Sequence, residues 1–73
     1  MDINELIKKE APANNEHDQA YAKALKASFE SFQGLSQKDL KIQLQLARER
    51  YRKNMGRHQD TADCIVLTEL IHD

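Results

Sequence analysis

The densest group of potentially reactive side chains runs from His58 to Cys64. Its imidazole, carboxylate and thiol groups are of the types that bind metals or act as nucleophiles and bases. Their spacing matches no metal-binding motif, and the sequence places no Cys-His or Ser-His-Asp pair. Asp60 and Asp63 are explained as the cap and first-turn acid of a helix. We therefore predict no metal site, no cofactor and no catalytic site, and do not expect an enzyme.

The single cysteine of the chain, Cys64, lies where a helix N-terminus would favour a thiolate. It also shares an apolar helical face with Leu67 and Ile71, so we expect a buried, structural cysteine. A lone cysteine is typical of a reducing compartment, and we predict a cytoplasmic location.

A second chemical signature is a group of cations that could neutralise phosphates: Arg48, Arg50, Arg52, Lys53 and Arg57. Tyr51 among them could stack on a base. The cations are distributed around the helix, however, and residues 35–58 carry a net charge of +5 beside −4 for residues 59–73. Such an asymmetry indicates helices that complement each other, and less often a binding face. Nucleic-acid binding by this segment is our alternative functional prediction.

Pro12, Gly34 and Gly56 divide the chain into four segments, each with helical periodicity. We expect helices over residues 2–9, 16–33, 36–55 and from about 60 to the end. Residues of N-capping type stand at the start of the first three segments, and they are Asp2, Asn15 and Ser36. Gly34 is expected to end the second helix in a left-handed conformation.

Leu40, Leu44, Ala47, Tyr51 and Met55 form one stripe on the third segment, which predicts its core face. The fourth segment is apolar around most of its circumference, which predicts a helix buried on several sides.

The third segment also carries a second apolar stripe. Ile42 and Leu46 lie roughly 160–200° around the helix from Leu40 and Leu44. One interpretation is an interface with a second copy or with a groove of another protein. The other is that Ile3, Leu6 and Ile7 of the first segment fold back and cover the stripe. The two interpretations can coexist if a partner displaces the N-terminal helix.

With 73 residues and a net charge of −1, the chain has the size of one small domain. No apolar run approaches the ~18 residues that a membrane span needs. The N-terminal sequence has no secretory signal, and Met1 leads us to expect a complete chain.

These observations predict an all-α fold, a small three-helix bundle over residues 15–73 with a short accessory N-terminal helix and linker over residues 1–13. We predict that the protein is a non-enzymatic interaction module, that is, an adaptor, inhibitor or regulator of bacterial or phage type. A homodimer is one form that it could take. It would bind itself or another protein, and no membrane. The residues expected to bind the partner are Ile42, Leu46, Arg50, Ile3, Leu6 and Ile7.

Overall fold

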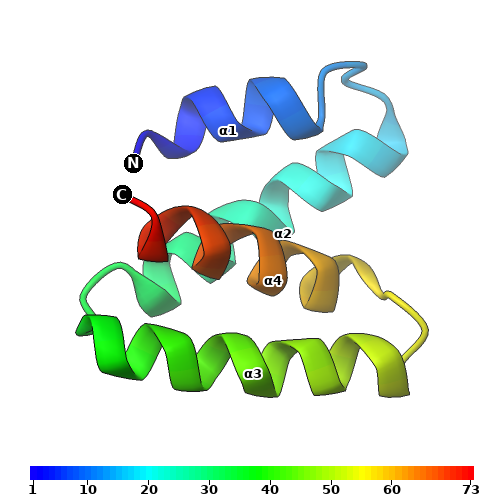
Figure 1. The fold of residues 1–73 in the computed structure, drawn as a ribbon. Helices are drawn as coiled ribbons and strands as arrows, with labels where there is room; N and C mark the ends of the chain where they lie inside the picture. The colour runs from blue at the N-terminus through cyan, green and yellow to red at the C-terminus, as the bar shows by residue number, and fades with distance from the viewer.

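The computed structural model describes all 73 residues and contains four α-helices and no strand. The helices are α1 (Ile3–Glu10), α2 (Glu16–Phe32), α3 (Gln37–Lys53) and α4 (His58–Ile71), joined by short turns (Figure 1). The all-helical prediction is confirmed.

Short polar side chains begin the first three helices, as predicted. Asp2 accepts hydrogen bonds from the backbone N–H groups of Asn4 and Glu5. The Asn15 side chain accepts one from the backbone of Asp18 at 2.8 Å, and Ser36 accepts one from Asp39 at 3.2 Å. Each contact satisfies a backbone donor that the first turn of a helix leaves without an intrahelical partner.

Two predictions about helix ends are wrong, one about the cap of α4 and one about the conformation of Gly34. Helix α4 begins at His58, with Arg57 in the N-cap position and no side-chain cap, so Asp60 is an internal first-turn residue. Gly34 does not adopt a left-handed conformation, whereas Met55 and Gly56 both do, with φ of 57° and 75°. The left-handed helix ending predicted after α2 therefore occurs only after α3.

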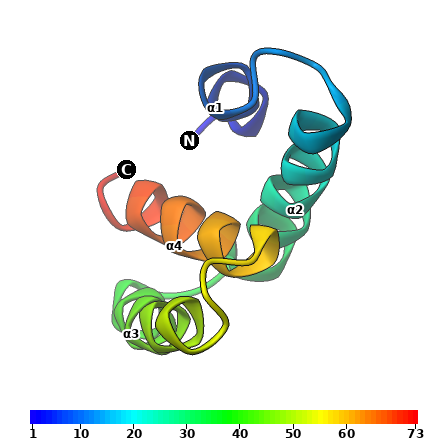
Figure 2. The same cartoon turned by 90° about the vertical axis from the view of Figure 1, so that its right-hand side faces the viewer.

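Helix α4 lies at the centre of the molecule and packs against both α2 and α3 (Figure 2). Its fully buried residues Ala62, Val66 and Leu67 face its two neighbours. The prediction that this helix is buried on several sides is confirmed, and the reason is that it supplies residues to both core clusters.

The larger core cluster joins α1, α2 and α4 through Leu6, Tyr21, Leu25 and Val66, among others. The sequence predicts α1 as an accessory to three helices, but α1 contributes the buried Leu6 and lies along α2. The chain thus forms a bundle of four helices in which the shortest one is part of the core.

The smaller core cluster joins α3 to α4 through Leu40, Ala47 and Leu67. Leu40 and Ala47 confirm the predicted core face of α3, and Leu44 is half-buried against them. The other two members of the predicted stripe are not core residues, since Tyr51 is 44% exposed and Met55 is 94% exposed. The stripe continues beyond the part of α3 that packs against α4. Its last member, Met55, lies in the turn between the two helices.

Candidate interaction surface

Helix α3 has an outward face as well as a core face. Ile42 and Leu46 lie on it, with 48% and 42% of their surface exposed, and we call them the outer apolar pair. They sit one helical turn apart and point away from Leu40 and Ala47, which contact α4. No other helix of the chain covers them.

The interpretation in which the N-terminal helix covers this pair is wrong. Helix α1 lies on the far side of α4 from α3 (Figures 1 and 2). Leu6 is buried in the larger core cluster, and Ile3 and Ile7 pack against the same cluster. The amphipathic pattern of α1 is therefore accounted for by the core. The structure does not bring the two halves of the predicted partner-binding set together.

Arg50, also in that set, turns toward the first turn of α4. Its guanidinium lies 3.5 Å from an oxygen of Asp63 and 3.9 Å from an oxygen of Asp60. Arg57 adds a 3.2 Å contact from its Nε to Asp60. Both cations therefore neutralise buried carboxylates of the same chain, as the charge asymmetry of the sequence indicated.

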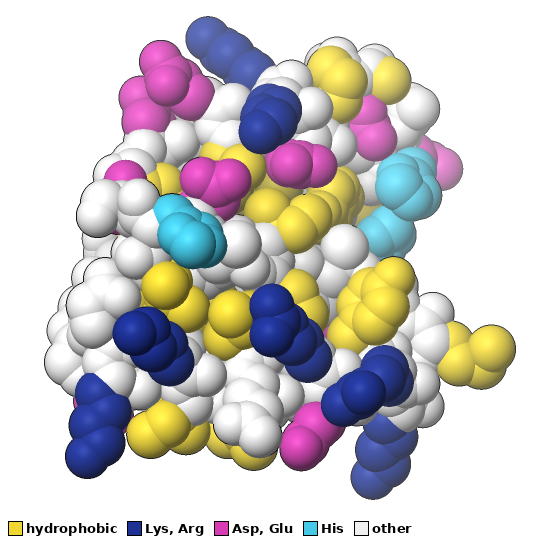
Figure 3. All heavy atoms as spheres, viewed as in Figure 1, with side chains coloured by type: hydrophobic (Ala, Val, Ile, Leu, Met, Phe, Trp, Pro, Cys, Tyr) yellow, Lys and Arg dark blue, Asp and Glu magenta, His cyan; other side chains and the backbone are white.

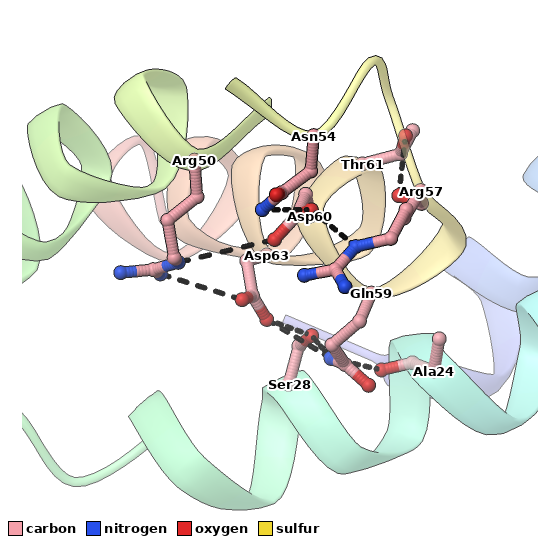
Figure 4. A network of polar contacts seen from close by, with 9 residues as sticks. All are labelled: Ala24, Ser28, Arg50, Asn54, Arg57, Gln59, Asp60, Thr61 and Asp63. Atoms are coloured by element: carbon pink, nitrogen blue, oxygen red, sulfur yellow. Dashed lines mark hydrogen bonds and ion pairs between the residues drawn. The ribbon is translucent and has the colours of Figure 1, made fainter. Parts of the chain in front are cut away.

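The carboxylates belong to a network that links three helices, the buried carboxylate network (Figure 4). Asp60 accepts a hydrogen bond from Asn54 at 3.2 Å. Asp63 accepts hydrogen bonds from the Ser28 hydroxyl and the Gln59 amide. Gln59 also donates to the Ser28 Oγ and to a backbone carbonyl of α2. No buried side-chain polar atom in the chain lacks a partner, so the network is fully satisfied.

Sequence reasoning missed this network. The sequence predicts Asp60 as a cap and Asp63 as a first-turn acid, and such residues lie at the surface in an ordinary helix. Here they are 3% and 7% exposed. The only signal in the sequence is the spacing of three residues between them, which puts both carboxylates on one face of α4 beside the basic end of α3.

The remaining predicted cations, Arg48, Arg52 and Lys53, are exposed and have no ion pair. Two of them border a shallow groove between α3 and α4 with a volume of about 760 Å³, which we call the basic groove. Its residues come from α3 except for one from α4, and they are Lys41, Leu44, Gln45, Arg48, Glu49, Tyr51, Arg52 and Cys64. Lys41 was not among the predicted site residues.

Cys64 at the floor of the groove is half-buried. Burial, and secondarily the nearby Asp63 carboxylate, raise the pKa of its thiol. A raised pKa lowers the thiolate fraction, which is the opposite of what a nucleophile requires. The Asp63 carboxylate is already engaged with Ser28, Gln59 and Arg50, so it is not free to accept the thiol proton.

Two histidines from different helices, His17 and His58, are in contact. The rings of His17 and His58 lie 4.6 Å apart in an edge-to-face arrangement, and the His58 ring lies 6.0 Å from that of Tyr21. This contact joins the start of α2 to the start of α4. Nowhere in the chain do three or more His, Cys, Asp or Glu side chains group in a way that could hold a metal ion.

Comparison with protein-family models, with curated proteins and with solved structures finds no match to this chain. None of the four helices combines the length and the apolar character needed to cross a bilayer.

Proposed function

We propose that this protein is a non-enzymatic interaction module that binds protein surfaces through α3. One observation carries the proposal. The four large hydrophobic side chains that remain exposed all belong to α3 or to the turn after it, and they are Ile42, Leu46, Tyr51 and Met55. Burial of apolar surface is the main driving force of protein association. A concentration of exposed apolar side chains on one helix favours that helix as the binding element.

Self-association is the form of binding that the outer apolar pair supports best. Two residues one turn apart form a short ridge that can pack against the same ridge of a second copy around a twofold axis. A chain of 8.4 kDa without a disulfide has a small core, and association would add apolar burial to it. A cytoplasmic setting belongs to the same proposal, because the single thiol has no partner within the chain.

The test is the molar mass in solution, measured by light scattering over a range of protein concentrations. We expect the unmodified chain to exceed 8.4 kDa with rising concentration and Ile42→Asp to remain at the monomer mass. Ala20→Asp is the matched control, because Ala20 is exposed on α2 and far from the pair. Its mass should follow that of the unmodified chain. Circular dichroism of each variant reports whether the helices persist.

Two results would refute the proposed self-association. The first is a monomer at every concentration for the unmodified chain. The second is an Ile42→Asp protein that assembles as the unmodified chain does. Loss of helicity in Ile42→Asp would instead assign Ile42 to the folded core, against its 48% exposure.

Nucleic-acid binding remains the second candidate, supported by the free side chains of Arg48, Arg52 and Lys53. Arg50 and Arg57 are engaged with Asp60 and Asp63, so three of the five predicted cations remain available. If these three cations contact phosphates, the affinity for duplex DNA should fall as the salt concentration rises. A plot of the logarithm of the binding constant against the logarithm of the salt concentration should have a slope of about −3. Fluorescence anisotropy of a labelled duplex at several salt concentrations measures that slope. Absence of binding at ~0.1 M salt would exclude this candidate.

A further inference from the structure

The basic groove has one charged border and one neutral border. Lys41, Arg48 and Arg52 project from α3 along it, and Cys64 is its only residue from α4. Lys and Arg side chains follow α3 along the lower part of the face in Figure 3, with hydrophobic side chains between them and α4. Most Asp and Glu side chains on this face lie farther up, toward α1. The groove therefore combines positive charge with apolar surface.

The three cations are available to a ligand. They form no ion pair or side-chain hydrogen bond within the chain, in contrast to Arg50 and Arg57. Lys41 and Arg48 are seven residues apart, and Arg52 follows four residues later, so all three lie on one side of α3. At 1.5 Å per residue they span about 16 Å, which is three turns of helix.

The floor between these cations and α4 is formed by Leu44, Tyr51 and Cys64. Leu44 and Cys64 are half-buried and Tyr51 is 44% exposed, so each offers apolar surface while remaining anchored in the fold. An apolar strip beside a line of cations is complementary to a helix that has an apolar face flanked by carboxylates.

We propose that the basic groove binds an acidic amphipathic helix of another protein, about three turns long. The partner's apolar residues would lie on Leu44, Tyr51 and Cys64, and carboxylates at spacings of four and seven residues would meet the three cations. This inference rests on the proposed function, since it names the partner class of an interaction module. It uses a different face of α3, because Lys41 is about 100° around the helix from Ile42.

Two features favour a peptide over a nucleic acid. Glu49 lies among the cations in the lining and would repel a phosphate chain, whereas a helical partner can place an uncharged or basic residue there. The cations also stand on one border only, beside an apolar floor. A phosphate backbone has no apolar surface with which to cover Leu44 and Cys64.

The probe is a 15-residue helical peptide, blocked at both ends and labelled with a fluorophore. It carries Leu at alternating spacings of three and four residues, with Glu on both flanks of the Leu stripe. A second peptide has Gln in place of each Glu, and a third has Lys. Fluorescence anisotropy measures their binding to the full-length protein. We expect the Glu peptide to bind more tightly than the Gln peptide by about tenfold or more, from three ion pairs at the edge of an interface.

Charge reversal locates the binding face. Lys41→Glu/Arg48→Glu should weaken the Glu peptide by about tenfold and should strengthen the Lys peptide. The matched control is Lys23→Glu/Lys26→Glu, which changes the net charge equally through two exposed, unpaired residues of α2. It should leave the affinity for the Glu peptide within about twofold.

Cys64 reports occupancy of the groove directly, because it is the only cysteine and lies in the floor. At a peptide concentration ten times Kd, about one tenth of the protein is free. The rate of alkylation by iodoacetamide, a neutral reagent, should then fall about tenfold. A peptide bound elsewhere would leave the rate unchanged.

The proposal is overturned by any of three results. They are equal weakening by the groove and control variants, unchanged alkylation of Cys64 under saturating peptide, and tighter binding of a 15-nucleotide single strand than of the Glu peptide. A failure of the proposed self-association can be told apart from a failure of the groove proposal. Ile42→Asp should bind the Glu peptide as the unmodified chain does, whatever its effect on the molar mass. A molar mass insensitive to Ile42→Asp alongside specific peptide binding would leave the groove as the interaction site.

Discussion

Asp63 shows how one residue ties three helices together. Its two carboxylate oxygens accept hydrogen bonds from Ser28 of α2, Gln59 of α4 and Arg50 of α3. Asp63 is only 7% exposed. A buried carboxylate is tolerated only when hydrogen bonds and an opposite charge replace its lost hydration. Asp63 has both the hydrogen bonds and the opposite charge. These contacts fix how the three helices are oriented relative to one another.

Asp63→Ala should therefore lower the free energy of unfolding by about 2–3 kcal/mol, because the Ser28 hydroxyl loses its acceptor and Arg50 loses the nearer of its two carboxylates. Asp63→Asn should cost less, since the amide oxygen can still accept the hydroxyl hydrogen bond. Glu49→Ala, on the exposed side of α3, is the control and should change stability by about 0.5 kcal/mol or less. Urea denaturation followed by circular dichroism measures all three. Equal stabilities for Asp63→Ala and Glu49→Ala would contradict a structural role for the network.

Tyr21 makes the stability of the fold depend on pH in the alkaline range. Burial, with a smaller effect of the Glu10 carboxylate, raises the pKa of its phenol from 10.0 to about 12. The unfolded chain therefore releases this proton first. The stabilisation from Tyr21 is complete below pH 10 and is lost as the pH rises through about 12.

We expect the free energy of unfolding to fall by roughly 1–2 kcal/mol between pH 10 and 11.5 from this group. Tyr21→Phe removes that part of the decline, whereas Tyr51→Phe, at a 44% exposed position, retains it. Because lysine titration affects both variants alike, the difference between their pH profiles isolates Tyr21. Superimposable profiles would show that Tyr21 is not the cause.

At the scale of the elements, the turn between α3 and α4 positions the basic end of one helix beside the acidic start of the other. The backbone N–H of Gly56 donates to the carbonyl of Tyr51 at 3.0 Å, which closes the end of α3. Met55 and Gly56 are both left-handed, and a side chain on Gly56 would meet the Tyr51 ring at 3.3 Å. The turn is therefore restricted both by its backbone conformation and by space.

Gly56→Ala should cost roughly 1–2 kcal/mol of stability, because an L-residue is strained at a φ of 75° and its Cβ presses on Tyr51. Gly34→Ala is the matched control. Gly34 has no heavy atom within 4 Å of an added Cβ and no positive φ, so alanine there should be neutral or stabilising by up to about 1 kcal/mol. Thermal unfolding of the two variants gives the comparison. A Gly56→Ala protein as stable as Gly34→Ala would contradict this account of the turn.

At the scale of the whole molecule, α4 unites the two core clusters. Val66 belongs to the cluster with α1 and α2, and Leu67 belongs to the cluster with α3. Both are fully buried, and adjacent residues of a helix point to different sides. The clusters therefore depend on the same helix, and we expect all four helices to unfold in one cooperative transition.

Leu67→Ala tests this dependence. A buried Leu→Ala change costs about 2–5 kcal/mol, while a core of this size supplies about 3–5 kcal/mol in total. We expect much of the helical circular dichroism of the whole chain to be lost at 25 °C. Leu46→Ala, in the outer apolar pair, should retain it, because its side chain is 42% exposed. Loss of only the helicity attributable to α3 in Leu67→Ala would argue against a single cooperative unit.

Local interactions made several features predictable. The caps at Asp2, Asn15 and Ser36 act within three residues, and the periodicity that defines each amphipathic face repeats every turn. Positions that needed knowledge of the neighbouring helix were harder. Tyr51 and Met55 continue the stripe of Leu40 and Ala47, but α4 does not extend far enough to cover them.

The sequence by itself determined that the chain is helical, where three of its helices begin, and that the basic α3 and acidic α4 complement each other, because these follow from short-range hydrogen bonding, periodicity and net charge. Only the tertiary structure decided that α1 packs on the far side of α4, that Asp60 and Asp63 are buried, and that Lys41 joins Arg48 and Arg52 along a groove. Those features depend on which helix packs against which face, and that is decided by contacts between residues far apart in the sequence, which a local pattern does not contain.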